Sequence, residues 1–274
     1  MTSQTARATA PQSPILLREM LGSVAILTLN RPEARNSLSE GLIAELDAAL
    51  REIHDDAKVR AVVIAANGPA FSAGHDMKEL TARRADGDRG RAYFAEIMTA
   101  CSAMMQAIVH LPKPVVAAVQ GIATAAGCQL VASCDLAVGS EAATFATPGV
   151  DIGLFCSTPM VALSRNVPRK HAMEMLLTGE PISATTARDI GLINHVVAAG
   201  AERDAAIALA QKVALKSAYT VKIGKAAFYR QAEMSLAGAY RYAAEVMTEN
   251  MMARDAEEGI GAFIEKREPK WQEK

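Results

Sequence analysis

The chain has 274 residues, of which 50% are hydrophobic, 22% are charged and 4% are aromatic. This length supports one large α/β domain or two small ones, with a sizeable core. The formal net charge of −1 gives no general attraction to nucleic acid or to an anionic membrane. The cysteines form no CxxC pair, which indicates reduced thiols rather than a disulfide framework; they are Cys101, Cys128, Cys134 and Cys156.

The N-terminal residues 1–13 are rich in Ala, Thr and Ser, lack acidic residues and contain one arginine, Arg7. We predict a disordered tail there, because a single arginine is weak support for a transit peptide. No apolar run reaches the roughly 18 residues that a membrane helix needs, so no membrane partner is expected. The expected location is the cytoplasm, or the mitochondrial matrix in a eukaryote.

Strands and helices alternate in the first part of the chain. Residues 81–91 are charged and without periodicity, which predicts a mobile loop. Helices with an apolar face are predicted at residues 39–53, 93–110 and 125–133. Apolar runs rich in β-formers predict strands at residues 24–30, 61–66, 115–119, 136–138 and 144–146.

After about residue 162 the pattern predicts helices alone. They are expected at residues 170–177, 183–190, 203–216, 219–250 and 256–266. Strands alternating with helices, followed by helices only, favour an α/β core and a helical C-terminal segment. We place the core at residues 14–200 and a helical oligomerisation region at residues 201–274.

Two turns rich in alanine and glycine stand out between the predicted strands and helices. The first is Phe71-Ser72-Ala73-Gly74-His75-Asp76, and the second runs from Gly121 to Leu130 as GIATAAGCQL. Small residues let a ligand approach the backbone closely. Either turn alone also fits a helix packed tightly on a strand.

These two turns resemble segments of the enoyl-CoA hydratase/isomerase (crotonase) superfamily. Their order and spacing fit further similar pieces: LNRP from Leu29, KPVVAAVQG from Lys113, CDLA from Cys134 and LTGEPISA from Leu177. The resemblance implies an α/β fold of the ClpP/crotonase type, a β-β-α spiral core with a helical C-terminal trimerisation region. It also implies a homotrimer or a dimer of trimers. Residues 123–135, 147–150 and 153–159 are similar to one subgroup, the third-named mitochondrial enoyl-CoA hydratase domain-containing paralogue and its bacterial counterparts.

Members of this superfamily bind acyl-CoA and stabilise a thioester enolate with two backbone N–H groups. By resemblance these are the amides of Ala73 and Ala126. Ala126 stands where glycine is common, and it keeps the N–H if its backbone needs no positive φ. No metal or redox cofactor is implied, and coenzyme A enters only as part of the substrate.

The resemblance also implies how coenzyme A is held. The main chain from Ala73 through His75 and Asp76 to Met77 corresponds to the segment that holds the adenine end. Phe263 and Lys266 match a C-terminal Phe-x-x-Lys through which relatives contact CoA, often from a neighbouring subunit. Lys266 can equally be a solvated surface lysine.

Both glutamates of typical hydratases are missing: by resemblance, Gln129 and Gly149 stand in their places. Neither a carboxamide nor a glycine can take the proton that hydration of an enoyl thioester requires, so efficient hydration is not expected. Asp151 is a candidate substitute, although a loop acid or helix cap is the plainer interpretation. His75 can also substitute, or it can be a solvent-facing histidine. Cys128, Cys156 and Ser157 are candidate pocket linings, with buried cysteine expected to be inert.

Three functions remain open from the sequence. The first is an acyl-CoA enzyme that uses the backbone donors with a non-standard acid or base, for hydration, decarboxylation or thioester hydrolysis. The second is a weakly catalytic or regulatory acyl-CoA-binding protein, and the third is a structural subunit. A serine hydrolase is excluded because residues 70–74 lack the first glycine of G-x-S-x-G. The lysines of residues 211–230 are too sparse for a nucleic-acid site.

Overall fold

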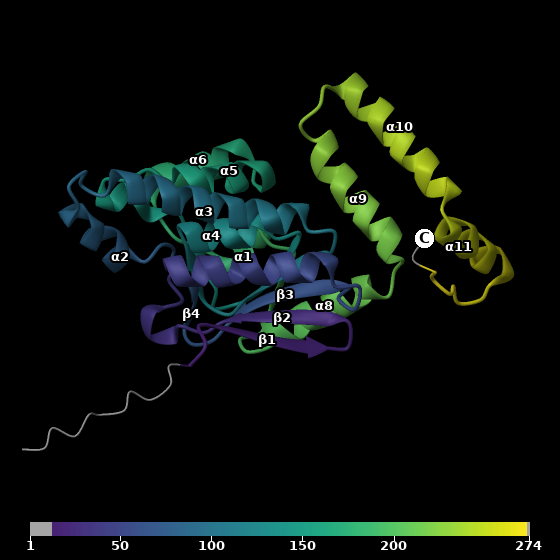
Figure 1. Cartoon of the computed structure of the whole chain (residues 1–274), viewed down its shortest axis with the longest axis horizontal. Helices are drawn as coiled ribbons and strands as arrows, with labels where there is room; N and C mark the ends of the chain where they lie inside the picture. The colour runs from purple at the N-terminus through teal and green to yellow at the C-terminus, as the bar shows by residue number, and fades with distance from the viewer. Residues whose placement is uncertain (1–12, 273–274) are drawn as a thin grey trace, which may run out of the picture.

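The computed structural model describes residues 13–272, so the predicted tail lies outside the described residues except for Ser13. Two β-sheets form the centre of the molecule (Figure 1). The six-stranded sheet has the order β1 (Leu16–Leu21), β2 (Val24–Leu29), β3 (Ala61–Ala66), β5 (Val115–Val119), β7 (Leu136–Ser140) and β10 (His195–Val197). The four-stranded sheet has the order β4 (Ala70–Ser72), β6 (Ile122–Thr124), β8 (Thr144–Ala146) and β9 (Ile182–Ser183).

Successive coils of the chain contribute one strand to each sheet. β3 is followed by β4, β5 by β6 and β7 by β8, and within each sheet these strands pair in parallel. Helices carry the chain back between coils: α2 (Met77–Ala82) and α3 (Arg91–His110) after the first, and α4 (Ala126–Ser133) after the second. The β-β-α spiral predicted by resemblance is therefore confirmed.

The central strands of the six-stranded sheet, β2, β3 and β5, are buried on both faces, as continuous apolar strands predict. Along β2, Val24 and Ile26 face one cluster of buried side chains, whereas Leu27 and Leu29 face another. The first face is covered by α8 (Glu202–Ala214), through the small buried side chains of Ala206 and Ala210.

The other face carries the larger core, which includes α1 (Glu40–Asp55), α3 and α4. Ser39 caps α1 by accepting a hydrogen bond from the Leu42 amide, as the sequence predicts. Among the described residues, α3 is the one helix whose length and composition would also suit a membrane span. It packs against α1 and α4 with one apolar face, made of Ile97, Cys101, Met104, Met105 and Ile108. A core helix meets the same criteria, and this packing fits a core helix.

Five shorter elements complete the spiral body around the second sheet. They are η1 (Pro32–Ala34), η3 (Pro148–Ile152), α5 (Ser157–Asn166), α6 (Arg169–Thr178) and α7 (Ala184–Asp189).

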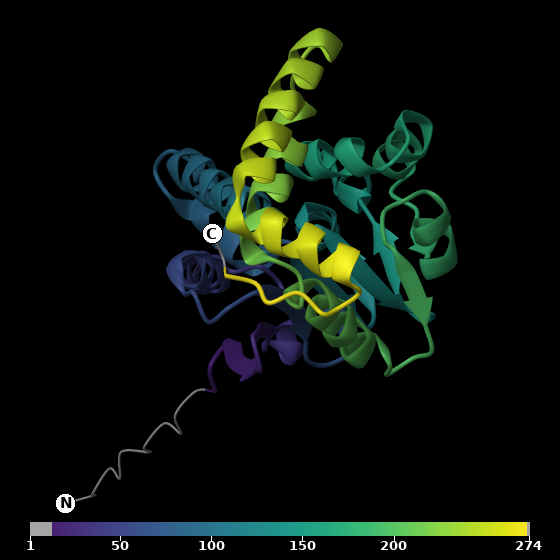
Figure 2. The same ribbon diagram turned by 90° about the vertical axis from the view of Figure 1, so that its right-hand side faces the viewer.

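Three C-terminal helices stand away from this body. α9 (Ala218–Gln231), α10 (Leu236–Met252) and α11 (Arg254–Glu265) lie at one end of the molecule, and α10 and α11 project beyond it (Figures 1 and 2). We call α9–α11 the arm. None of the residues of α9 or α10, all of which are described, is buried.

Two predictions about the elements need correction. α8, which the predicted boundary at residue 200 assigns to the C-terminal region, packs on the six-stranded sheet. The single helix expected at residues 219–250 is two helices, separated at residues 232–235 where Ser235 caps α10. The loop expected at residues 81–91 is partly ordered: α2 ends within it, and η2 (Arg83–Ala85) follows.

Candidate active site

The two glycine-containing turns meet, as the sequence predicts. Gly74 has φ +85°, and a Cβ placed on it would lie 2.9 Å from the Ala125 Cβ and 3.3 Å from the Ala126 nitrogen. A Cβ on Gly127 would lie 2.2 Å from the Ser72 carbonyl oxygen. No side chain fits at either contact, so the two backbones approach as closely as glycine permits.

Ala125 turns the chain sharply between β6 and α4. Its φ of 50° and ψ of −117° are rare for a residue with a side chain, and such conformations cost about 1–3 kcal/mol. Its amide continues the second sheet by donating to the Ala146 carbonyl at 2.9 Å. Ala126 then starts α4 with no positive φ, so the condition for a usable amide at this alanine is met. Within the described chain no acceptor binds this amide.

The prediction for Ala73 is wrong. Its amide donates to the Arg35 carbonyl at 3.0 Å, so this N–H is not available to a ligand. The available amide is that of His75, two residues later. Leu38 pairs with His75 through the Gly74 carbonyl and the Asp76 amide. In such a parallel bridge His75 is the middle residue, and its own amide points away from Leu38. No acceptor in residues 13–272 binds the His75 amide.

The His75 side chain is more enclosed than a solvent-facing histidine. Both ring nitrogens are buried, and neither has a hydrogen-bond partner in the described structure. Burial lowers the pKa of His75, and the nearby Leu38 carbonyl opposes this only in part. The imidazole is therefore neutral near pH 7.

Asp76 orders the loop. Its carboxylate pairs with Arg31 at 3.1 Å, accepts from the Ser37 hydroxyl at 3.1 Å, and caps α2 by accepting from the Lys78 amide. Burial pulls the pKa of Asp76 upward, but these hydrogen bonds outweigh it and hold the pKa below its ordinary value. A carboxylate engaged in this way is not a ready proton acceptor. Met77, which starts α2, is 46% exposed.

Gln129 lies one helical turn beyond Ala126 on α4 and is only 5% exposed. Its side-chain oxygen is buried, with no hydrogen-bond partner among residues 13–272. An unpartnered buried amide oxygen costs about 1–3 kcal/mol. The His75 ring and Gln129 are thus two polar side chains without partners, and they lie on the same two segments as the available amides.

Gly149 occupies a position with no space for a side chain. A Cβ there would lie 2.9 Å from both the Cys156 sulfur and the Leu154 carbonyl oxygen. The loop folds back because the Leu154 amide donates to the Gly149 carbonyl at 2.9 Å. The space beside Gly149 is thus filled by neighbouring backbone and by the Cys156 thiol.

The remaining candidates are poorly placed for proton transfer. Asp151 is exposed, and its carboxylate lies against Gly179 at the end of α6, where a Cβ would come within 3.0 Å of it. Burial raises the pKa of Cys128 to about 12 and also raises that of Cys156, so both thiols stay protonated, as expected of inert cysteines. Within residues 13–272, no group of three or more His, Cys, Asp or Glu side chains could hold a metal ion.

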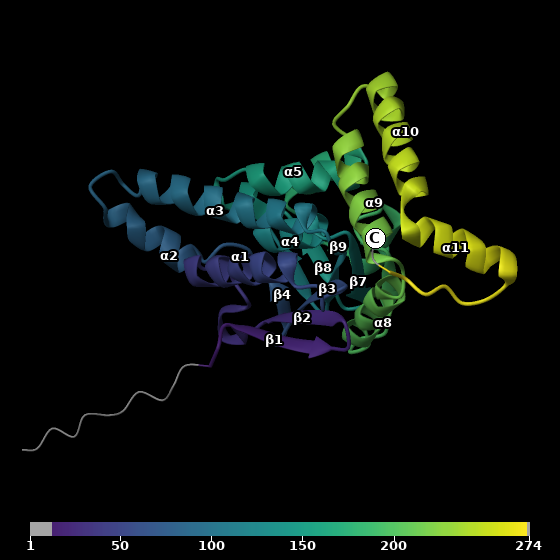
Figure 3. The same cartoon turned by 45° about the vertical axis from the view of Figure 1, so that its right-hand side comes forward.

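Phe263 and Lys266 are not brought to the site of their own chain. Phe263 is 84% exposed on α11, and Lys266 ends that helix in a left-handed conformation with φ 55°. Figure 3 shows α11 and α2 at opposite ends of the molecule. The two parts of the CoA site expected by resemblance are therefore separate within one chain.

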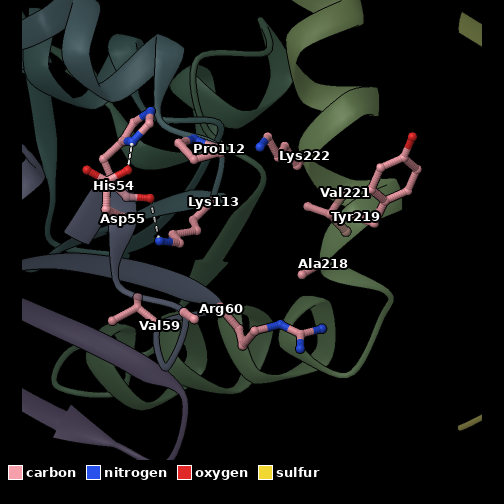
Figure 4. A pocket seen from close by; sticks show the side chains of 11 residues that line it. His54, Asp55, Val59, Arg60, Pro112, Lys113, Ala218, Tyr219, Val221 and Lys222 are labelled. Carbon is pink, nitrogen blue, oxygen red and sulfur yellow. Dashed lines mark hydrogen bonds and ion pairs between the residues drawn. The ribbon is translucent and has the colours of Figure 1, made fainter. Parts of the chain in front are cut away.

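A hollow of about 370 Å³ lies elsewhere, between α9 and the body (Figure 4). Its lining includes His54, Asp55, Lys113 and Lys222, but none of the residues predicted for the site. Lys113 points away from it toward the end of α1, where its amine donates to the carbonyls of residues 53, 54 and 56. This hollow belongs to the joint between body and arm.

The family model for enoyl-CoA hydratase/isomerase matches residues 19–274. This chain belongs to the enoyl-CoA hydratase/isomerase family. It is 46% identical over 251 residues to human enoyl-CoA hydratase domain-containing protein 3, mitochondrial, covering 92% of this chain and 81% of that protein. The rat protein of the same name is 48% identical over 245 residues, covering 89% and 80%.

Solved structures of the family agree with this fold. The crystal structure of an enoyl-CoA hydratase from Mycobacterium smegmatis has a TM-score of 0.89 and 50% identity, covering 94% of this chain and 99% of that one. The human domain-containing protein 3 structure has a TM-score of 0.89 and 45% identity, covering 94% and 100%. The crotonase-type fold and the predicted subgroup resemblance are thereby confirmed.

Proposed function

We propose that this protein binds acyl-CoA thioesters, and that the amides of His75 and Ala126 hold the thioester oxygen as it gains enolate character. The observation that carries the proposal is the pair of unused amide hydrogens on two turns in direct contact at Gly74. A buried amide without a partner is unfavourable unless a ligand binds it. Fixed backbone donors aimed at a developing oxyanion are typically a large term in catalysis.

The first candidate reaction is the family's own, addition of water to a 2-enoyl-CoA to give a 3-hydroxyacyl-CoA. Gln129 can orient water or substrate by hydrogen bonding, but a neutral carboxamide does not take the proton. Because each positioned acid or base typically contributes about 10²–10⁴-fold, we expect hydration to be slow.

The closed space at Gly149 favours a second candidate, a reaction that depends more on the amide donors than on paired carboxylates, such as decarboxylation or thioester hydrolysis. A non-catalytic acyl-CoA-binding or regulatory role is the third candidate.

The proposed site also suggests how CoA is held and which copies of the chain contribute to it. The main chain from Ala73 to Met77 is proposed to hold the adenine end of CoA, with Phe263 and Lys266 contributed by a neighbouring copy, because the arm holds them away from their own site. The exposed apolar side chains of the arm support association with other copies, which by the family resemblance we propose to be a homotrimer or a dimer of trimers. CoA is needed only as part of the substrate. The proposed location is the cytoplasm, or the mitochondrial matrix in a eukaryote, as the names of the vertebrate relatives suggest.

Replacing Ala126 with proline tests the donor directly. Proline is tolerated at the first position of a helix, so Ala126→Pro deletes the N–H while keeping α4. We expect crotonyl-CoA to bind more weakly to the variant than to wild type, while free CoA, which has no thioester carbonyl, binds both alike. Any crotonyl-CoA hydration, followed by loss of enoyl-thioester absorbance, should fall about 10²–10³-fold.

Arg169→Pro, at the exposed first residue of α6 in the body, is the matched control and should leave both affinities unchanged. Unchanged crotonyl-CoA affinity in folded Ala126→Pro would contradict the donor role. Failure of wild type to bind any acyl-CoA would contradict the proposed function. Tight binding without hydration would instead favour the second and third candidates.

A further inference from the structure

The last described residues of the chain run back along α11. Lys266 ends that helix in a left-handed conformation, and the Arg267 amide donates to the Ala262 carbonyl at 3.0 Å, so the chain reverses direction. Figure 2 shows the segment that follows lying beside α11. We call residues 267–272 the strap.

Two carboxylates on α11 hold the strap. Glu258 binds the Arg267 guanidinium through both of its oxygens, at 2.6 and 3.0 Å, and accepts from the Lys270 amide at 2.7 Å. Asp255, one turn earlier, is only 1% exposed and accepts from the Gln272 amide at 2.6 Å. Because the two acids are three residues apart, they lie on one face of the helix and meet the strap together.

The same contacts fix α11 to the start of α9. The second oxygen of Asp255 accepts from the Ser217 hydroxyl at 2.5 Å, and Ser217 caps α9. The Trp271 indole donates to the Leu215 carbonyl, just before α9, at 2.9 Å. The Trp271 ring also lies so close to Gly259 that a Cβ there would come within 3.1 and 3.2 Å of two ring carbons. The strap, α11 and the start of α9 therefore form one hydrogen-bonded unit.

Apart from this unit, α11 has little attachment to its own chain. Of its twelve residues, all of them described, only Asp255 and Ala262 are buried. Ile260, Phe263 and Ile264 are 46%, 84% and 73% exposed. Because so little apolar surface of α11 packs within its own chain, the direction of the helix depends on the strap.

We infer that the strap sets the direction of α11, and with it the place of Phe263 and Lys266 against the nucleotide end of CoA bound to a neighbouring copy. Asp255 and Trp271 are the positioning residues, because they hold α11 to α9 and act on the ligand only through that helix. The ligand group concerned is the phosphorylated adenosine of CoA, whose phosphates suit a lysine amine. This inference rests on the proposed function, which assigns Phe263 and Lys266 to that end of CoA.

Two glycines of α11 supply a matched pair of variants. A Cβ on Gly259 meets the Trp271 ring, whereas a Cβ on Gly261 meets no atom within 4 Å. Gly259→Val should therefore displace the strap by overpacking, while Gly261→Val makes the same change of helix propensity without touching it. Asp255→Ala and Trp271→Ala remove the two positioning side chains themselves.

Two ligands separate positioning from general damage to the fold. Butyryl-CoA and butyryl-pantetheine share the thioester, but only the first carries the nucleotide. We expect Gly259→Val, Asp255→Ala and Trp271→Ala to weaken butyryl-CoA about tenfold, the loss of one charge-assisted contact, as measured by isothermal titration calorimetry. Their affinity for butyryl-pantetheine should stay within about threefold of wild type, and Gly261→Val should bind both ligands like wild type.

A double-mutant cycle with Lys266→Met tests the link between the strap and the lysine. In wild type, Lys266→Met should weaken butyryl-CoA about tenfold. In Gly259→Val the same change should cost less than about threefold, because the amine is already displaced from the ligand. A loss in Gly259→Val as large as in wild type would show that the two act independently, and would overturn the inference.

Other outcomes would overturn it as well. Wild-type affinity for butyryl-CoA in the folded strap variants would show that α11 does not depend on the strap. Equal weakening of both ligands in those variants would show damage to the thioester site instead of misplacement of α11. A wild type that binds the two ligands equally would leave the thioester site in place but deny the nucleotide contact. A wild type that binds neither ligand is a distinguishable result, because it refutes the proposed thioester site itself.

Discussion

The spiral body and the arm differ in how far a single chain buries their apolar side chains. In the body all eight residues of α4 are buried, so the helix that carries Ala126 and Gln129 is enclosed by its own chain. In the arm, α9 and α10, described in full, contain no buried residue, and large apolar side chains such as Phe228, Leu236 and Met252 are 65–80% exposed. The body can thus form its core alone, whereas the arm presents apolar surface that only another surface can cover.

The two regions are joined by a polar anchor. The Lys225 amine on α9 donates to the Ile108 and Lys113 carbonyls and pairs with Asp135 at 2.7 Å. The Tyr229 hydroxyl donates to the same carboxylate at 2.9 Å. The Lys225 and Asp135 side chains are only 8% and 15% exposed, so this pair is desolvated.

Breaking this anchor should have the largest effect. Lys225→Met leaves Asp135 and two carbonyls without a cation, and removing one partner of a buried ion pair costs about 3–5 kcal/mol. We expect that decrease in the free energy of unfolding, measured by urea titration. Lys222→Met, one turn earlier on α9 at an exposed position in the hollow of Figure 4, is the matched control and should change stability by less than about 0.5 kcal/mol. Equal effects of the two variants would contradict the anchor.

A charge on the arm tests whether another copy covers it. Phe263→Asp places a carboxylate on a side chain that is 84% exposed, and loss of one buried phenylalanine is worth about 1.5–3 kcal/mol. The subunit dissociation constant should therefore rise at least about tenfold, measured by light scattering across a dilution series. Met20→Asp, on the exposed face of β1, should leave the mass unchanged. A wild type that is monomeric at high concentration would contradict the proposed assembly.

The smallest expected effect is a change in how the melting temperature of the body depends on acid pH. Because burial lowers the pKa of His75, the unfolded chain binds the histidine proton more tightly than the folded one, and stability falls as pH drops below about 6.5. His75→Ala removes this contribution. Between pH 7.5 and pH 5 the melting temperature of His75→Ala should fall less than that of wild type. An equal or larger fall in the variant would contradict the burial of a neutral imidazole.

The sequence predicts the meeting of the two turns but not the donors they present. Alanine and glycine at residues 73–74 and 125–127 indicate close backbone contact. The choice between the Ala73 and His75 amides depends on the Arg35 carbonyl and on the bridge to Leu38, residues almost forty positions earlier in the chain. Likewise the sequence shows only that Gly149 has no carboxylate. The structure adds that Leu154 and Cys156 fill the space that a side chain there would occupy.

Local patterns determined the elements themselves. Continuous apolar runs in the strands and the helical spacing of apolar residues in α1 are local features, so sequence alone places these elements. Tertiary structure decided which surfaces those elements share. The helical period of residues 202–214 resembles that of the arm, yet Ala206 and Ala210 are small enough to lie directly on the sheet, and α8 joins the body. The periodicity of a helix shows that one face is apolar, but only packing shows what that face contacts.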